Sequence, residues 1–262
     1  YTMSNSIIAK KRFGQHFLND SNIIDSIAHG LGAQPKEKII EIGPGTGALT
    51  QQLLKRDLDI TALEIDRDLI GYLKKEFFVY ENFSVLEANI LKTDIASLGF
   101  DQPVKIIGNL PYNISSPIIF HLLSQLPNIE EMYFMFQKEV VDRICASPGT
   151  KQYGRPSVVI QRVCHVQSEL VIPPEAFSPP PKVMSAMIRL RPLEKPLGSH
   201  LDSMFFEKFV ATAFSQRRKT LRNTIGKLVS KEEFLTAQID SSRRAETLSI
   251  EEFITLASFH RE

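Results

Sequence analysis

The feature that most constrains the fold is a glycine-rich turn between a short apolar run and a helical pattern. Residues 38–42 are mostly β-branched, the turn Gly-Pro-Gly-Thr-Gly follows at 43–47, and an amphipathic stretch covers 46–55. Glycine lets a backbone turn tightly and lets a ligand approach without obstruction by a Cβ atom. A strand, a glycine-rich turn and a helix in this order are typical of the ligand-binding corner of open α/β folds.

The same alternation continues along the chain. Because apolar strands separated by helices indicate a parallel sheet covered on both faces, we predict a Rossmann-like α/β domain with a mostly parallel seven-stranded sheet. Two extended runs, at 164–172 and 183–190, follow a helix after Pro156 and flank a proline cluster at 172–182. The other predicted strands are 38–42, 59–65, 83–86, 104–108 and 131–136, and the other helices are 46–55, 67–78, 116–126 and 137–146.

A second region begins after the proline- and glycine-containing stretch 191–200, which indicates a linker. Beyond it the pattern is wholly helical, at 201–214, 216–229, 231–238 and 249–259, and Ser249 with Glu252 predicts a capping box. We therefore predict a cofactor-binding catalytic domain over 3–191, with a basic lead-in at 3–20, and a small all-helical domain over 192–262.

Composition excludes several classes of protein. The chain is 43% hydrophobic and 23% charged, which is ordinary for a globular protein, and its apolar runs are too short to span a bilayer. The two cysteines form no CxxC pair and the six histidines are scattered, so we expect no metal site. The polar, basic beginning indicates no secretory signal, and we expect a cytoplasmic protein without membrane contact.

The glycine spacing favours one cofactor over another. The turn follows G-x-G-x-G, whereas dinucleotide folds use G-x-G-x-x-G to seat a pyrophosphate. Glu41, just before the turn, suits a ligand with a cationic amino-acid end, and Glu64, at the tip of the next strand, can accept both ribose hydroxyls. Together these features favour S-adenosylmethionine over NAD. The candidate cofactor residues are Glu41, Gly43, Gly45, Gly47 and Glu64, with Asn89 after the third strand as an acceptor for the cofactor adenine.

The fourth strand ends in Asn109-Leu110-Pro111-Tyr112, where a ligand crevice is expected. An aromatic amine is a poor nucleophile because its lone pair is delocalised. The side-chain oxygen of Asn109 and the carbonyl of Leu110 can accept the amine hydrogens and localise that lone pair, while Pro111 stiffens the loop. Tyr112 can stack on the base. The alternative is an ordinary proline-containing turn with a buried tyrosine.

Phe177, in the proline-rich loop, is a candidate for a second aromatic that closes a sandwich on the base; the alternative is a hydrophobic anchor for that loop. Two basic clusters suggest contact with RNA phosphates, and the alternative is solvated charge. We expect the second cluster to lie on a helix of the 192–262 domain, which we therefore predict to bind RNA or the ribosome. The clusters comprise Lys10, Lys11 and Arg12, and Arg217, Arg218, Lys219 and Arg222.

With these residues assembled, the chain resembles the KsgA family of small-subunit ribosomal RNA adenine dimethyltransferases. The resemblance implies transfer of four methyl groups from S-adenosylmethionine to two adjacent adenosines in the 3′-terminal hairpin loop of 16S rRNA. It also implies an immature small (30S) subunit as the substrate, a role in subunit biogenesis and a monomeric enzyme. The matching stretches are KRFGQHFLND (11–20), EIGPGTGALT (41–50), EIDRDL (64–69), GNLPYNIS (108–115), FMFQKEVVDR (134–143), AFSPPPKV (176–183) and FSQRRKTLRN (214–223).

By this resemblance the cofactor contacts fall on His16, Leu18, Gly43, Glu64, Asn89 and Asn109. The chain departs from the family pattern at His16, where Asn is frequent, and at Asn89, where Asp is frequent. Three alternatives remain: a DNA adenine methyltransferase, which usually carries Asp-Pro-Pro-Tyr; a large-subunit rRNA methyltransferase of the erythromycin-resistance type; and an assembly factor that acts by binding.

Overall fold

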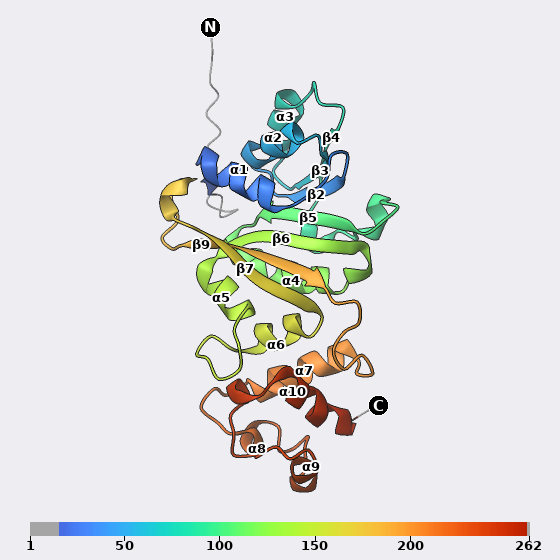
Figure 1. Ribbon diagram of the computed structural model, residues 1–262, viewed down its shortest axis with the longest axis vertical. Coiled ribbons are helices and arrows are strands. Elements are labelled where there is room, and N and C mark those ends of the chain that lie inside the picture. The colour runs from blue at the N-terminus through green and yellow to red at the C-terminus, as the bar shows by residue number, and fades with distance from the viewer. Residues whose placement is uncertain (1–15, 261–262) are drawn as a thin grey trace. The chain divides into compact units, whose positions relative to one another are not determined.

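The computed structural model describes residues 16–260, which divide into two compact units (Figure 1). The first comprises the described residues up to Lys138 together with Ser168–Leu190, and the second comprises Glu139–Gln167 with the residues from Arg191 onward. The second unit thus includes a stretch that precedes the predicted linker, whereas the assignment of a catalytic domain to 3–191 and an RNA-binding domain to 192–262 stays a prediction.

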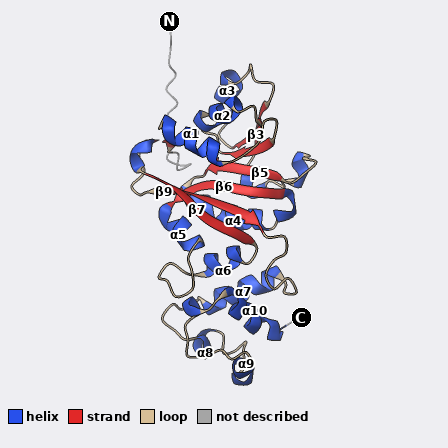
Figure 2. Ribbon diagram, viewed as in Figure 1, coloured by secondary structure: helices blue, strands red, loops and turns tan. Residues whose placement is uncertain are grey.

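The described strands form one large mixed sheet and one small ribbon (Figure 2). The large sheet has seven described strands in the order β4-β3-β2-β5-β6-β9-β7; β4 to β6 pair in parallel, and β9 runs antiparallel to β6. This arrangement confirms the predicted Rossmann-like class. The strands are β1 (Phe17–Leu18), β2 (Lys38–Ile42), β3 (Asp59–Glu64), β4 (Phe83–Glu87), β5 (Val104–Asn109), β6 (Ile129–Gln137), β7 (Cys164–Ile172), β8 (Phe177–Ser178) and β9 (Ser185–Pro192).

Helices α1 (Ser21–Gly30), α2 (Ala48–Lys55) and α3 (Arg67–Glu76) share a hydrophobic core with one face of the sheet. Ile39, Ile60 and Ile107 point into this core, and alternate residues such as Ile40 and Ile106 are fully buried on the other face. Along the chain, β2, β3 and β4 are added toward one edge of the sheet, and β5 and β6 are added on the opposite side of β2. The right-handed connection from β5 to β6 therefore places α4 (Ser115–Leu123) on that other face. Ligand crevices form in such sheets where the order reverses, which here is between β2 and β5.

The small ribbon joins two distant parts of the chain. β1 pairs antiparallel with β8, so that Phe17 lies opposite Ser178 and Leu18 opposite Phe177. Next to it, the amide of Asn19 donates to the carbonyl of Ala176 at 2.8 Å. The ribbon therefore fixes the beginning of the described chain against the proline-rich segment.

The regular structure of the second unit is helical, apart from the first residues of β7 and the last residues of β9. Its helices are α5 (Lys138–Ile144), α6 (Arg155–Gln161), α7 (Ser203–Ala213), α8 (Leu221–Thr224), α9 (Lys231–Thr236) and α10 (Ile250–Ala257). Arg162, only 3% exposed, ends α6 and donates to the carbonyls of Leu197, Gly198 and Leu201. Its guanidinium lies 4.6 Å from the centre of the Phe206 ring. One buried cation therefore connects the end of α6 to the loop that precedes α7 and to α7 itself.

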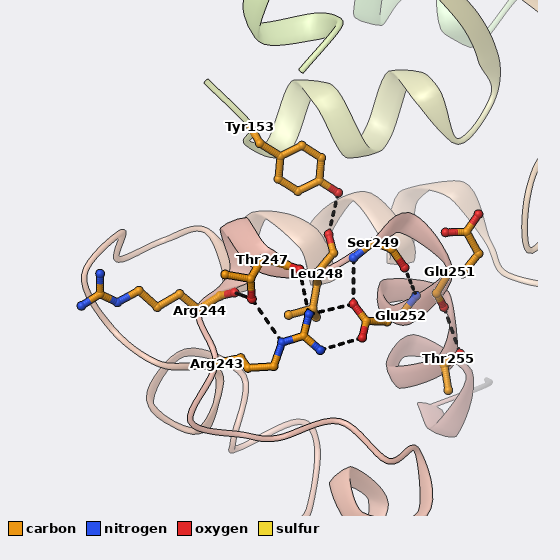
Figure 3. Close-up of polar contacts among 9 residues, drawn as sticks. All are labelled: Tyr153, Arg243, Arg244, Thr247, Leu248, Ser249, Glu251, Glu252 and Thr255. Atoms are coloured by element: carbon orange, nitrogen blue, oxygen red, sulfur yellow. Dashed lines mark hydrogen bonds and ion pairs between the residues drawn. The ribbon is translucent and has the colours of Figure 1, made fainter. Parts of the chain in front are cut away.

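The start of α10 confirms the predicted capping box (Figure 3). The hydroxyl of Ser249 accepts from the amide of Glu252 at 3.1 Å, and the Glu252 carboxylate accepts from the amide of Ser249 at 2.9 Å. Arg243 adds two donations to the same carboxylate, at 2.6 and 3.0 Å. The hydroxyl of Tyr153 reaches the carbonyl of Leu248 at 2.8 Å, which ties the loop before α6 to this helix end.

The predicted helix over 216–229 is wrong. Only Leu221–Thr224 is α-helical, while residues 214–219 form turns after α7. A seven-residue run from Gln216 to Arg222 holds four cations and few apolar residues, so it lacks an apolar face that a continuous helix would bury. No helix among residues 16–260 is long and apolar enough to cross a membrane.

Candidate active site and cofactor cavity

A cavity of about 290 Å³ opens at the carboxyl ends of the central parallel strands. Its wall combines the glycine-rich turn after β2, the tip of β3, the segment after β4 and the loop after β5. The predicted site residues that line it are His16, Leu18, Glu41, Gly43, Gly45, Glu64, Asn89, Asn109, Leu110, Pro111 and Tyr112. The structure thus brings together nearly all residues predicted for the cofactor and the reacting base.

The three glycines of the turn share a backbone conformation but differ in what surrounds them. All three have positive φ, at 63°, 61° and 83° for Gly43, Gly45 and Gly47. A Cβ on Gly45 would approach the Phe17 ring to 3.1 Å, and a Cβ on Gly47 would meet the Phe77 ring at 2.4 Å. Gly47 is not among the described residues that line the cavity, so its place in the structure is explained by packing of the turn against Phe77.

Glu41 is a buried carboxyl at the floor of the cavity. It is 1% exposed, and the Thr50 hydroxyl on α2 donates to it at 2.6 Å. Burial raises the pKa of Glu41 from 4.5 to about 7, the Thr50 hydrogen bond lowers it in part, and nearby Glu64 raises it further. Sequence reasoning did not identify Thr50.

Glu64 ends β3 and is 6% exposed. One carboxylate oxygen accepts from the amides of Ile65 and Asp66, both at 2.9 Å. Burial raises the pKa of Glu64, and these amides oppose that rise. The two amides fix the orientation of the carboxylate, and a further backbone hydrogen bond, from Gly45 of the glycine-rich turn, also lowers its pKa.

Asn89 caps a short 3₁₀ helix at 90–92, and its side-chain oxygen accepts from the amide of Leu91 at 3.0 Å. An amide oxygen has two lone pairs, so the predicted acceptance from a cofactor amine stays possible beside this cap. An Asp at this position would cap in the same way. It would also add a negative charge to a cavity that Glu41 and Glu64 already line.

These groups fit S-adenosylmethionine. No lysine or arginine is among the described residues that line the cavity, so Glu41 and Glu64 meet no cationic side chain there. A ligand with a cationic amino-acid end and a ribose supplies the partners that two buried carboxylates require. A pyrophosphate would be repelled by the same two groups. Within residues 16–260 no group of three or more His, Cys, Asp or Glu side chains could hold a metal ion.

Asn109 stands at the end of β5, half-buried, with its amide nitrogen 3.2 Å from the carbonyl oxygen of His16. Because a carbonyl accepts only, this contact assigns the nitrogen to the His16 side and leaves the Asn109 oxygen for another donor. The backbone of Leu110 is held by Met135, whose carbonyl accepts from the Leu110 amide at 3.4 Å.

Tyr112 lies in the 3₁₀ turn after Pro111, and its ring is fixed at several points. Its hydroxyl forms a 2.6 Å hydrogen bond with Ser185, and its carbonyl accepts from Ser115 at 3.0 Å. The His16 ring stacks on it with a centroid distance of 5.6 Å and an interplanar angle of 24°. Burial raises the pKa of Tyr112, which keeps the phenol neutral.

His16 also forms a 2.7 Å hydrogen bond through Nδ1 with the carbonyl of Pro179. The described chain begins at this residue, and no pattern in the sequence pairs 16 with 179. Phe177 is 3% exposed, belongs to the core shared by α1 and α2, and is not among the described residues that line the cavity. Its stacking on a base stays a prediction, and its observed packing matches the anchor alternative.

The basic clusters are placed unevenly. Lys10, Lys11 and Arg12 lie outside the described residues. Arg217, Arg218 and Lys219 are exposed in the turn region after α7, and Arg222 is exposed on α8, so the prediction of one shared helix is wrong. The Arg217 guanidinium donates to the carbonyl of Lys151 at 3.0 Å and lies 3.7 Å from Glu246.

Comparisons with known proteins agree on a family. The sequence profile described as "Ribosomal RNA adenine dimethylase" matches residues 7–262. A "Ribosomal RNA small subunit methyltransferase A" from Hahella chejuensis is 46% identical over 252 residues, covering 96% of this chain and 92% of that protein. The protein of the same name from Pseudomonas aeruginosa is 45% identical over 251 residues, covering 95% and 94%.

Solved structures extend the likeness to three dimensions. A dimethyladenosine transferase from Plasmodium falciparum superposes with a TM-score of 0.76 at 27% identity, covering 92% of this chain and 96% of that one. The 23S rRNA methyltransferase ErmE superposes with a TM-score of 0.72 at 25% identity, covering 92% and 98%. The chain therefore belongs to the ribosomal RNA adenine dimethylase family and is an S-adenosylmethionine-dependent rRNA adenine dimethyltransferase.

Proposed function

We propose that this enzyme dimethylates the N6 amines of two adjacent adenosines in the 3′-terminal hairpin loop of 16S rRNA, within an immature small ribosomal subunit. The observation that carries the reaction is the orientation of Asn109, whose amide nitrogen points to the His16 carbonyl. The choice of the small subunit is supported by relatives named "Ribosomal RNA small subunit methyltransferase A", which are 45–46% identical over 95–96% of the chain. The large-subunit enzyme ErmE is 25% identical.

The chemistry follows from what the residues offer. When bound, S-adenosylmethionine supplies an electrophilic methyl group on a sulfonium. Glu64 would hold the ribose hydroxyls, Glu41 would face the cationic amino-acid end and Asn89 would accept from the adenine amine. A cofactor held in this way would lie in the cavity that Asn109 and Leu110 also line.

The target amine is a neutral donor of two hydrogens. The side-chain oxygen of Asn109 and the carbonyl of Leu110 accept them, which draws the nitrogen toward tetrahedral geometry and localises its lone pair for in-line attack. Tyr112 stacks on the purine, and such a contact contributes about 1–3 kcal/mol. Unstacking the base costs a few kcal/mol, least in a loop, which suits a hairpin-loop target. Positioning and electrostatics supply the catalysis.

The exposed cations at 217–219 and 222 provide the other part of the proposal, which is contact with rRNA phosphates. Arg217 keeps most of its surface in solvent, with 65% of the side chain exposed, despite its contacts with Lys151 and Glu246. Phosphate contacts fix orientation without reading sequence, so specificity would come from the shape of the particle and from the adenine pocket.

The test incubates the enzyme and radiolabelled S-adenosylmethionine with one of three substrates: small ribosomal subunits or large ribosomal subunits from cells that lack the modification, or duplex DNA. We expect label in N6,N6-dimethyladenosine of small-subunit RNA only, at two adjacent positions. Label in large-subunit RNA would establish the ErmE-like alternative, and label in DNA would establish a DNA methyltransferase. Cofactor binding without any transfer would support a protein that acts by binding to the particle.

A further inference from the structure

We propose that Ser185 is a positioning residue, which anchors the far end of the Tyr112 ring at the place where the target adenine stacks. The inference rests on the proposed function, because it assigns a task to a residue that serves the same base. Ser185 was not identified by any pattern in the sequence.

The position of Ser185 in the sheet makes it a rigid hydrogen-bond partner for the Tyr112 hydroxyl. Its side chain is fully buried, and it is the first residue of β9, where it pairs with Gln137 of β6. Tyr112 lies on a short 3₁₀ turn outside the sheet. The 2.6 Å hydrogen bond between their hydroxyls therefore connects the far end of a loop aromatic to the central sheet. The Tyr112 hydroxyl lies on the axis of the second χ angle, so this anchor fixes where the far end of the ring lies. The His16 ring stacked on one face limits rotation about that angle, which is intrinsically broad for tyrosine.

His16 determines which face of the ring remains for the base. A base between two rings needs roughly 7 Å between them, twice the stacking rise of about 3.4 Å. The rings of His16 and Tyr112 are 5.6 Å apart, so no base fits between them as they stand. The adenine would stack on the face of Tyr112 that is turned from His16. The 177–185 segment holds both rings, through Pro179 for His16 and Ser185 for Tyr112.

The test is a double-mutant cycle on the full-length enzyme with unmethylated small subunits. Ser185→Ala and Tyr112→Phe each remove one partner of the same hydrogen bond. We expect each to lower kcat/KM about three- to tenfold, and the double variant to lose no more than either single one. The dissociation constant for S-adenosylmethionine, measured by calorimetry, should stay within twofold of the wild-type value.

A second cycle provides the control. Tyr153→Phe also removes a buried tyrosine hydroxyl bond, to the Leu248 carbonyl, in the other unit. Its effect should multiply with that of Ser185→Ala, since the two bonds share no partner. Ser185→Cys, of similar size but with weaker hydrogen bonding, should fold and give an intermediate loss of kcat/KM.

Losses that multiply in the Ser185→Ala/Tyr112→Phe variant would overturn the inference, as would wild-type kcat/KM in Ser185→Cys and Ser185→Ala with only a lower Tm. Either result with an active wild-type enzyme leaves the proposed function intact. A wild-type enzyme that transfers no methyl group to small subunits would overturn the proposed function and this inference with it.

Discussion

Carboxylates in the two units have opposite surroundings. Glu41 and Glu64 line a cavity that no described lysine or arginine lines, and burial raises the pKa of each. In the helical unit, Glu252 accepts from Arg243 and from the Ser249 amide, and the hydrogen bonds from Arg243 lower its pKa. A carboxylate that is paired within the protein stabilises the fold, whereas one left to a cavity is kept for a ligand. The comparison predicts which substitutions alter chemistry and which alter stability.

The largest effect is expected at Asn109, the cavity residue that we propose as an acceptor for the reacting amine. Asn109→Ala should lower kcat by about 10²–10³, the cost of removing one preorganised polar contact with a developing charge. Its one described hydrogen bond, to the His16 carbonyl, is long at 3.2 Å, so Tm and cofactor affinity should change little. Steady-state methyl transfer and calorimetry measure both. Normal turnover in Asn109→Ala would remove Asn109 from the mechanism.

Glu41 predicts an unusual pH dependence of stability without cofactor. Its folded pKa of about 7 lies above the ordinary value of 4.5, so the folded state binds the proton more tightly than the unfolded chain. The stability that Glu41 contributes is therefore present below pH 4.5 and lost as pH rises to about 7. Glu41→Gln keeps an acceptor for Thr50 and should be more stable than the wild type at pH 8, by up to about 3 kcal/mol. Denaturant unfolding at pH 5 and pH 8 tests this, and identical pH slopes for the two proteins would contradict it.

At Glu64 the expected loss is in cofactor affinity. Glu64→Gln keeps an oxygen for the amides of Ile65 and Asp66 but removes the charge offered to the ribose. A hydrogen bond to a charged group contributes about 1.5–3 kcal/mol, so the dissociation constant should rise about 10- to 150-fold. Calorimetry with S-adenosylmethionine measures it. An unchanged constant would show that Glu64 does not hold the ribose.

Charge reversal tests the exposed cations of the helical unit, which the proposed function assigns to contact with rRNA phosphates. Arg217→Glu/Arg218→Glu should weaken binding to small subunits and reduce the slope of log affinity against log salt by about 1.5–2. Lys227→Glu, another exposed cation of that unit, is the control for net charge. Equal behaviour of the two variants would return Arg217 and Arg218 to ordinary solvated charge.

The smallest effect is expected at Glu252, a carboxylate paired within the protein. Glu252→Gln should lower the free energy of unfolding by about 1 kcal/mol, through a weakened capping box and the lost charge partner of Arg243. Because the Glu252 pKa is lowered, this stabilisation is present above pH 4.5 and fades as pH falls. Thermal unfolding at pH 7 and pH 3.5 measures it. A changed cofactor affinity in Glu252→Gln would break the contrast between the units.

Local pattern predicted much of the fold and most of the cavity wall. The runs 38–42 and 164–172 match β2 and β7 residue for residue. The first is short, apolar and rich in β-branched residues, which favours a buried strand. Glu41, Glu64 and Asn109 were identifiable because each follows or ends a strand whose carboxyl end must face the crevice.

The rest depends on contacts distant in sequence. Ser185 and Tyr112, which share a hydrogen bond, are 73 residues apart in the sequence, and His16 and Asn109 are 93 residues apart. No sequence periodicity predicts pairs at such separations. A helix over 216–229 was predicted because the pattern after the linker looked helical throughout, and the prediction was wrong because the basic run 216–222 has no apolar face to bury. Phe177 was assigned to the base from its loop, and its burial became visible only once β1 had paired with β8.

That pairing has a consequence for synthesis on the ribosome. The wall that carries His16 and Phe17 is held by Phe177 and Ser178, more than 150 residues later in the chain. A nascent chain released before residue 178 would contain every glycine and carboxylate of the cofactor site and still lack the partner that closes it. Cofactor binding thus becomes possible only after most of the first unit has been translated, and prematurely terminated products are left without the activity.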